Sequence, residues 1–189
     1  MKRTMTLRDV ILLGLMAALV LIFSGLRIYI PLPVDHAAIQ FGNIMCVLSG
    51  LMLGPLGGLS SAVGSCLYDL FNPVYAPEAW ITFLTKFFIG FLAGLIAHWG
   101  GRNGARRGWN LAGAAAGSLA YVVLYLGKSL IMGRYVFSLA AGSPMMLYIV
   151  PKAATSLVNA VIAVVVAVPL WELIRRPLSV SSKRPRPLS

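Results

Sequence analysis

Residues Trp80–Trp99 read WITFLTKFFIGFLAGLIAHW, and Lys86 is the only lysine, arginine or acidic residue among them. An α-helix needs about 20 predominantly apolar residues to cross the hydrocarbon core of a bilayer. Tryptophan is enriched at the two membrane–water interfaces, where the ends of such a helix lie. The stretch therefore predicts a transmembrane helix and an integral membrane protein.

Other apolar segments surround this one. Of the 189 residues, 59% are hydrophobic and 11% are charged, whereas soluble domains carry about 25% charged residues. The expected segments are about Leu7 to Gly25, Ile39 to Leu53, Leu59 to Phe71, Trp80 to Trp99, Trp109 to Met132 and Tyr148 to Ile174. The second and third are short and meet at a tight turn, Gly54–Gly58. We therefore expect an all-α integral membrane fold, a bundle of six transmembrane helices.

The first segment has the charge and apolar pattern of a signal peptide, but no small-residue cleavage pattern follows it. We expect it to be retained as the first helix of a membrane domain over residues 1–176. Residues 177–189 combine serine, proline and basic side chains. That composition is typical of disorder, so we expect a flexible cytoplasmic tail there.

The basic residues between the apolar segments predict the orientation. Eleven of the 16 fall on one side of a six-span arrangement. They are Lys2, Arg3, Arg8, Arg102, Arg106, Arg107, Arg175, Arg176, Lys183, Arg184 and Arg186. Cytoplasmic loops are enriched in lysine and arginine, so we expect both termini in the cytoplasm. Because the net charge of +11 lies largely in these flanks, it indicates topology, and no nucleic-acid partner is expected.

Charged residues interrupt the apolar segments in the predicted outer third of the bilayer: Asp69, Lys86, Lys128 and Lys152. A charge at the bilayer centre costs about 2.5–3.5 kcal/mol on insertion scales. One ordinary explanation is that the lysines face lipid and extend toward the headgroups. Another is that they pair internally with Asp69 or Glu78. Small and polar residues share a helical face with each lysine, which argues against lipid-facing positions and predicts a pocket that opens outward.

The candidate substrate-binding residues have polar or aromatic side chains near that depth. They are Asp69, Asn72, Trp80, Lys86, Tyr121, Tyr125, Lys128, Lys152, Ser156 and Asn159. The surplus of lysines over acids favours a ligand with an anionic or strongly hydrogen-bond-accepting group. The aromatic residues fit a flat heterocycle, without choosing among pyrimidine, flavin, pterin or pyridoxine-like rings. Neither the cysteines nor the histidines have metal-site spacing, so no metal or cofactor is expected.

Two further features suggest contacts beyond the pocket. The connection Leu26–Ala38 is unusually apolar, and it fits a lid over the pocket equally as well as a segment lying on the membrane surface. The first segment carries Gly14, Ala17 and Ala18 on one stripe. Small residues let helices approach closely in lipid, so this stripe is a candidate contact for a partner helix.

Several stretches, in this order, resemble a known family. They are TLRD at Thr6–Asp9 leading into GLMAA at Gly14–Ala18, IQFGN at Ile39–Asn43, LMLGPLGG at Leu51–Gly58, GSCLYDLF at Gly64–Phe71 and TFLTKFFIGFLAG at Thr82–Gly94. From Met1 to about Ile174 the chain is similar to the S component, the substrate-binding subunit, of energy-coupling factor (ECF) vitamin transporters. It is most similar to the hydroxymethylpyrimidine and riboflavin-like branch.

The resemblance implies a six-helix bundle in a bacterial-type cell membrane that binds one small vitamin or vitamin precursor. It also implies partners, namely a membrane T component and two ATPase subunits, besides the bilayer lipid. The stripe Gly14, Ala17 and Ala18 would dock on the T component, with Gly14 departing from the usual Ala-x-x-x-Ala pattern. Such a subunit would topple in the membrane to release its ligand inside. ATP hydrolysis would belong to the partners, because this sequence has no phosphate-binding loop motif.

Two other classes of protein compete with this interpretation. An intramembrane enzyme would need a nucleophile with a base or a metal cluster, but His36 and His98 fall at opposite predicted sides. We therefore do not expect an enzyme. A polytopic scaffold of the cell envelope, without transport activity, is the alternative that stays open. Mass spectrometry of a ligand that co-purifies with the protein would separate the two, because a scaffold needs no vitamin pocket.

Overall fold

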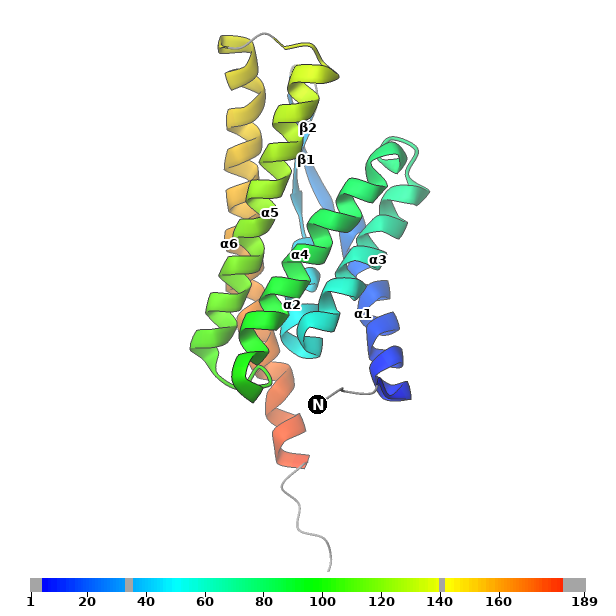
Figure 1. Ribbon diagram of the computed structural model, residues 1–189, viewed down its shortest axis with the longest axis vertical. Coiled ribbons are helices and arrows are strands. Elements are labelled where there is room, and N and C mark those ends of the chain that lie inside the picture. Colours follow the sequence, from blue (N-terminus) through cyan, green and yellow to red (C-terminus); the bar gives the residue numbers. More distant parts are fainter. Residues whose placement is uncertain (1–4, 33–35, 140–141, 182–189) are drawn as a thin grey trace, which may run out of the picture.

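The computed structural model describes residues 5–32, 36–139 and 142–181. Its α-helices and one two-stranded hairpin are shown in Figure 1. The elements are α1 (Leu7–Gly25), β1 (Arg27–Pro31), β2 (His36–Gln40), α2 (Gly42–Leu53), η1 (Gly54–Leu56), α3 (Gly57–Phe71), η2 (Ala76–Glu78), α4 (Ala79–His98), η3 (Trp99–Gly101), α5 (Arg107–Tyr135) and α6 (Ser143–Ser181). The three η elements are short 3-10 helices.

Five helical segments of the described chain are long and apolar enough to cross a membrane, which makes this a multi-pass membrane protein. Residues Gly42–Phe71, which comprise α2, η1 and α3, count as one of the five. The 12 residues of α2 extend for about 18 Å at 1.5 Å per residue, too short for a hydrocarbon core of about 30 Å. The predicted count of six spanning helices is therefore not confirmed.

The hairpin corrects the predicted start of the second helix. We expected a helix from Ile39, but β2 continues to Gln40 and α2 begins at Gly42. The strands are antiparallel, with Arg27 opposite Gln40 and Pro31 opposite His36. A strand and a helix both satisfy backbone polar groups, and a short apolar run does not distinguish them. The tip of the hairpin, residues 33–35, lies outside the described residues.

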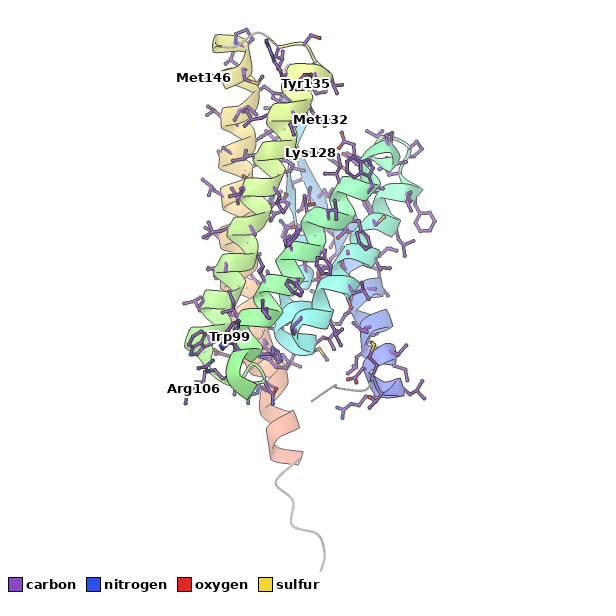
Figure 2. The ribbon with its side chains drawn as sticks, in the orientation of Figure 1. Trp99, Arg106, Lys128, Met132, Tyr135 and Met146 are labelled. Carbon is purple, nitrogen blue, oxygen red and sulfur yellow. The ribbon has the colours of Figure 1, made fainter. Side chains whose placement is uncertain are left out.

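The start of α1 and the end of α6 lie at the same end of the bundle. Figure 1 places the start of α1, the α4–α5 connection and the end of α6 together, and we call this the termini end. The hairpin, η2 and the end of α5 lie at the opposite end, which we call the pocket end. Figure 2 shows the same polarity, with Lys128 and Met132 toward the pocket end and Trp99 and Arg106 toward the termini end. Which end faces the cytoplasm stays a prediction.

The sixth helix is longer than expected. It runs over 39 residues to Ser181, so residues 177–181 are helical where we predicted a disordered tail. Extending an existing helix adds one hydrogen bond per residue without a new nucleation cost. A segment of low helix propensity can therefore continue a long helix. The rest of the predicted tail, residues 182–189, lies outside the described residues.

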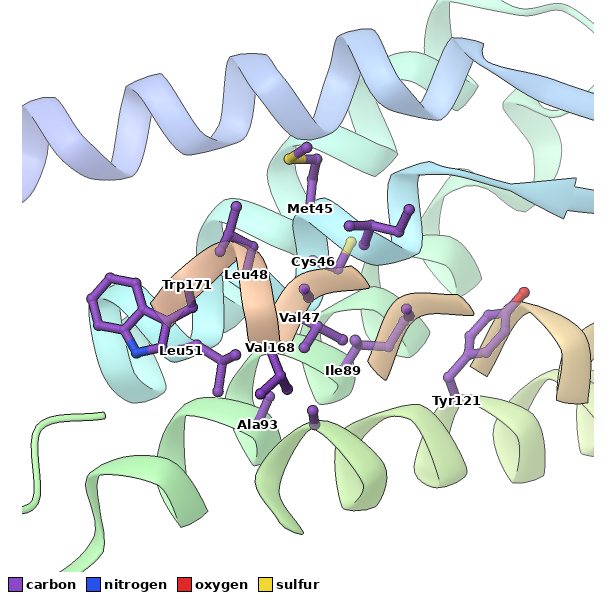
Figure 3. Packing of buried hydrophobic residues seen from close by; sticks show 14 of the residues in the cluster. Met45, Cys46, Val47, Leu48, Leu51, Ile89, Ala93, Tyr121, Val168 and Trp171 are labelled. Carbon is purple, nitrogen blue, oxygen red and sulfur yellow. The ribbon is translucent and has the colours of Figure 1, made fainter. Parts of the chain in front are cut away.

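The core is built around α2, whose residues from Gly42 to Leu51 are all buried. Its side chains pack against α4 and α6, as Figure 3 shows for Val47, Leu51, Ile89 and Val168. The helix also contacts α5. The helices approach closely at glycines: a Cβ added to Gly94 would lie 2.1 Å from the carbonyl oxygen of Gly54. This close packing drives association in lipid, and it holds the floor of the cavity described next.

Candidate functional site

A cavity of about 250 Å³ lies at the pocket end, bounded by the hairpin, the end of α3, η2 and the neighbouring parts of α4, α5 and α6. Its charged lining residues are Arg27, Asp69, Glu78, Lys86, Lys128 and Lys152. Its aromatic lining residues are Tyr75, Tyr121, Tyr125 and Phe137. Basic side chains thus outnumber acidic ones among the described lining residues by four to two.

Six of the ten predicted binding residues line this cavity. They are Asp69, Lys86, Tyr121, Tyr125, Lys128 and Lys152. They come from four segments far apart in the sequence, and the fold brings them together. Their binding roles stay predictions.

The other four predicted residues have different surroundings. Asn72 is the C-cap residue that follows α3, and it accepts a hydrogen bond from the backbone N–H of Val74 at 3.1 Å. Trp80 is 65% exposed and lines a separate apolar groove with Cys66 and Leu70. The Ser156 hydroxyl donates to the carbonyl oxygen of Ala153 at 2.9 Å.

Asn159, the last of these four, fixes the hairpin to α6. Its Oδ1 accepts from the backbone N–H of Gln40, and its Nδ2 donates to the carbonyl oxygen of Ala38, both at 2.8 Å. The side-chain amide therefore bonds the free edge of β2 as a neighbouring strand would. Ala38 and Gln40 line the cavity, so Asn159 holds one of its walls in place.

Lys86 is a buried cation that lines the cavity. Its side chain leaves α4 and is only 4% exposed. Its Nζ donates to Oε1 of Gln40 at 2.9 Å and to Oδ1 of Asn43, and it lies 4.8 Å from the centroid of the Tyr121 ring. Two neutral amides and a ring face therefore surround this charge. Gln40 is not among the residues predicted from the sequence, because nothing local indicates a contact 46 residues away.

Arg27 is a second residue that we missed. Its guanidinium lies 3.0 Å from Oδ1 of Asp69, with both side chains nearly inaccessible. It also donates to the carbonyl oxygen of Ser24 at 2.6 Å and lies 4.4 and 4.9 Å from the ring centroids of Tyr68 and Tyr75. The end of α1, the hairpin and the end of α3 are joined at this one side chain. The available signal was an arginine and an aspartate both predicted near the outer surface.

The Tyr75 phenol lies outside the spanning segments, beside this arginine. Burial raises the pKa of Tyr75, and a hydrogen bond with Tyr29 raises it further. The phenol therefore stays protonated at neutral pH and acts as a hydrogen-bonding group at the rim of the cavity.

Two more cations line the α5 and α6 side of the cavity. Lys128 on α5 forms an ion pair with Glu78 of η2, which joins these two elements across the rim. Lys152 on α6 donates to the Tyr148 hydroxyl at 3.0 Å and lies 5.9 Å from the centroid of the Tyr125 ring. The Tyr121 and Tyr125 rings stack on each other with centroids 5.6 Å apart and form an aromatic wall.

The predicted partner stripe lies on α1, which packs mainly against α2 and α3. Gly14 and Ala18 are exposed, and a Cβ added to Gly14 would meet nothing within 4 Å. Ala17 is turned toward α3, where its carbonyl oxygen would lie 2.3 Å from a Cβ added to Gly64. The open face of α1 thus contains two of the three predicted residues. Whether a partner covers it stays a prediction.

In the described part of the chain, no group of three or more His, Cys, Asp or Glu side chains is arranged to hold a metal ion. The cavity instead offers ammonium groups, amides and aromatic faces. Such groups bind a polar organic molecule by charge, hydrogen bonds and stacking.

Two comparisons with known proteins bear on this site. A family model described as "ECF-type riboflavin transporter, S component" matches residues 4–176. A protein of Pyrococcus woesei, described as an uncharacterized protein in the gap 3′ region, is 29% identical over 110 residues. The similarity covers 58% of this chain and 70% of that protein.

Proposed function

This chain belongs to the family of ECF-type riboflavin transporter S components, and from that premise we propose that it captures a small water-soluble vitamin or vitamin precursor from outside the cell. The ligand is a heterocycle with an anionic or strongly accepting group, and the cavity at the pocket end is its binding site. The protein then delivers it inward together with a T component and two ATPase subunits. The pocket end faces outward and both termini face the cytoplasm.

The observation that carries this proposal is a polar cavity walled by Lys86, Lys152 and the Tyr121–Tyr125 pair. Ionisable side chains at membrane depth are costly, and they mark substrate pathways where they face the interior of a bundle. Four predicted helices contribute to one cavity, as a binding site requires. A scaffold gains nothing from burying this many charges around an open space.

The exposed face of α1 supports the proposed assembly. Gly14 and Ala18, one helical turn apart, leave a shallow surface on which another membrane helix can pack closely. The T component is the partner proposed for this face. Toppling of the subunit during release fits a helix whose other side packs mainly against α2 and α3.

Mass spectrometry of small molecules released from the purified protein tests the proposal. We expect a stoichiometric heterocyclic compound in the heat-denatured extract of the wild type. Lys152→Ala serves as the comparison, because it removes a cation of the cavity and should lower the amount of bound compound. An extract without any bound small molecule, together with no binding across a panel of vitamins, would favour the scaffold alternative.

A further inference from the structure

The size and the donors of the cavity define its ligand more closely. Resting on the proposed function, we propose that the ligand is a compact heterocycle of one or two rings that carries an acidic group, and that Lys86 binds this group. On this proposal a three-ring flavin with its polyol chain is excluded by its size. The acid is a carboxylate or a phosphate, since both present anionic oxygens to an ammonium group.

The first support is volume. The cavity measures about 250 Å³, below the roughly 300–1,000 Å³ of sites that bury drug-sized ligands. A flavin with its side chain is a ligand of that larger class. One or two fused rings with a short substituent suit the smaller volume.

The second support is that the walls are fixed by contacts that a larger ligand would have to break. Arg27 and Asp69 join the hairpin to α3, and Lys128 joins α5 to η2. The oxygen and the nitrogen of the Asn159 side-chain amide both form hydrogen bonds with the backbone of β2. The Tyr121 and Tyr125 rings already stack on each other, so a ligand ring cannot enter between them.

The third support is the hydrogen-bonding balance around Lys86. The two carboxylates of the described lining are engaged elsewhere, Asp69 with Arg27 and Glu78 with Lys128. Lys86 therefore donates to neutral amide oxygens of Gln40 and Asn43. Nδ2 of Asn43 is buried and finds no acceptor among the described residues. Donors exceed acceptors at this point, which favours a ligand that brings anionic oxygens.

These contacts also orient the ligand. Lys86 lies over the Tyr121 ring, so an acid bound there places the attached ring beside the aromatic wall. Gln40 is the exchangeable partner, because its side chain comes from the hairpin and its backbone stays bonded to Asn159. The acid thus replaces Oε1 of Gln40 as an acceptor for Lys86, while the hairpin wall of the cavity stays in place. Phe137 and Met132 remain at the rim for the opposite edge of the ring.

Calorimetric titration of the detergent-purified protein tests both halves of the proposal with matched probes. The one-ring probes are nicotinate with nicotinamide, and pyridoxal 5′-phosphate with pyridoxal. The three-ring probes are flavin mononucleotide with riboflavin. We expect a one-ring acid to bind at least tenfold more tightly than its neutral counterpart, and neither flavin to bind. The compound that co-purifies with the protein should obey the same two limits of size and charge.

The variant Lys86→Met removes the proposed charge and keeps most of the side-chain length. Loss of a charge-assisted hydrogen bond should lower the affinity for the acid by roughly 10- to 100-fold and leave the affinity for the neutral analogue unchanged. Arg106→Met is the matched control, because Arg106 is an exposed cation at the termini end. This control should change neither of the two affinities.

Each result bears on a different claim. Tight binding of riboflavin, or of a neutral one-ring compound that Lys86→Met leaves unaffected, would overturn this inference while the proposed function stands. A wild-type protein that holds no co-purified compound and binds no probe would overturn the proposed function, and this inference with it.

Discussion

Methionine in place of Arg27 removes one partner of a buried ion pair and leaves the other, Asp69, without its cation. The two side chains are 6% and 5% exposed, and Nη2 and Oδ1 lie 3.0 Å apart. Breaking a buried pair in this way costs about 3–5 kcal/mol, because the remaining charge is uncompensated. The substitution also removes the hydrogen bond to Ser24 and the contacts with the Tyr68 and Tyr75 rings. Methionine fills most of the same space, so the cavity it leaves is small.

For a domain of this size, 1 kcal/mol shifts the unfolding midpoint by about 2–4 °C, so we expect Arg27→Met to lower it by roughly 6–20 °C. Thermal unfolding in detergent, followed by tryptophan fluorescence, measures the shift. Arg107→Met is the matched control, because Arg107 and Glu172 lie 3.5 Å apart with side chains 76% and 29% exposed. Such an exposed pair is worth at most about 1 kcal/mol, so the control should shift the midpoint by less than about 4 °C.

A double substitution separates the charge from the packing. Arg27→Met combined with Asp69→Asn leaves no unpaired charge, and we expect it to recover more than half of the lost stability. The reasoning fails if Arg27→Met unfolds within about 4 °C of the wild type. It also fails if the double variant is no more stable than Arg27→Met, because the loss would then come from packing alone.

Three further predictions concern other parts of the molecule. Asn159→Leu removes both hydrogen bonds to β2, so calorimetry should show about tenfold weaker binding of the co-purified ligand; unchanged affinity would mean that the hairpin wall holds without this clamp. Ala18→Leu should leave ligand affinity unchanged and abolish co-purification of the T component, whereas Val123→Leu on the exposed face of α5 should affect neither; a complex that survives Ala18→Leu would exclude this face as the docking site. Gly94→Ala should unfold at a clearly lower temperature than Gly14→Ala, because the added Cβ lies 2.1 Å from a carbonyl oxygen at Gly94 and in open space at Gly14; equal midpoints would contradict the close helix crossing.

Much of the helical framework could be predicted, because hydropathy is a local property of the chain. The first segment was expected at Leu7–Gly25 and α1 has those bounds. The fourth was expected from Trp80 to Trp99 and α4 runs over Ala79–His98. Lysines within apolar segments were equally visible, which is why Lys86 was recognised as a candidate.

The hairpin and its contacts could not be predicted in this way. Ile39 is apolar and precedes an apolar helix, so the residue alone does not indicate a strand. What makes it one is the pairing of β2 with β1 and with the Asn159 amide, whose partners lie 119 and 121 residues away in the sequence. The same distance in sequence hid the role of Gln40 as the acceptor for Lys86.

The sequence by itself determined that the chain lies in a membrane, which segments form its helices, and that the charged residues within those segments lie toward one side of the membrane. Those properties follow from the free energy of transferring each segment into lipid, which depends on composition and spacing. Only the tertiary structure decided which charges neutralise one another. It pairs Arg27 with Asp69 and Lys128 with Glu78, and it leaves Lys86 among neutral amides. The physical reason is that an ion pair depends on a separation of a few ångströms, and this separation is set by the packing of distant segments.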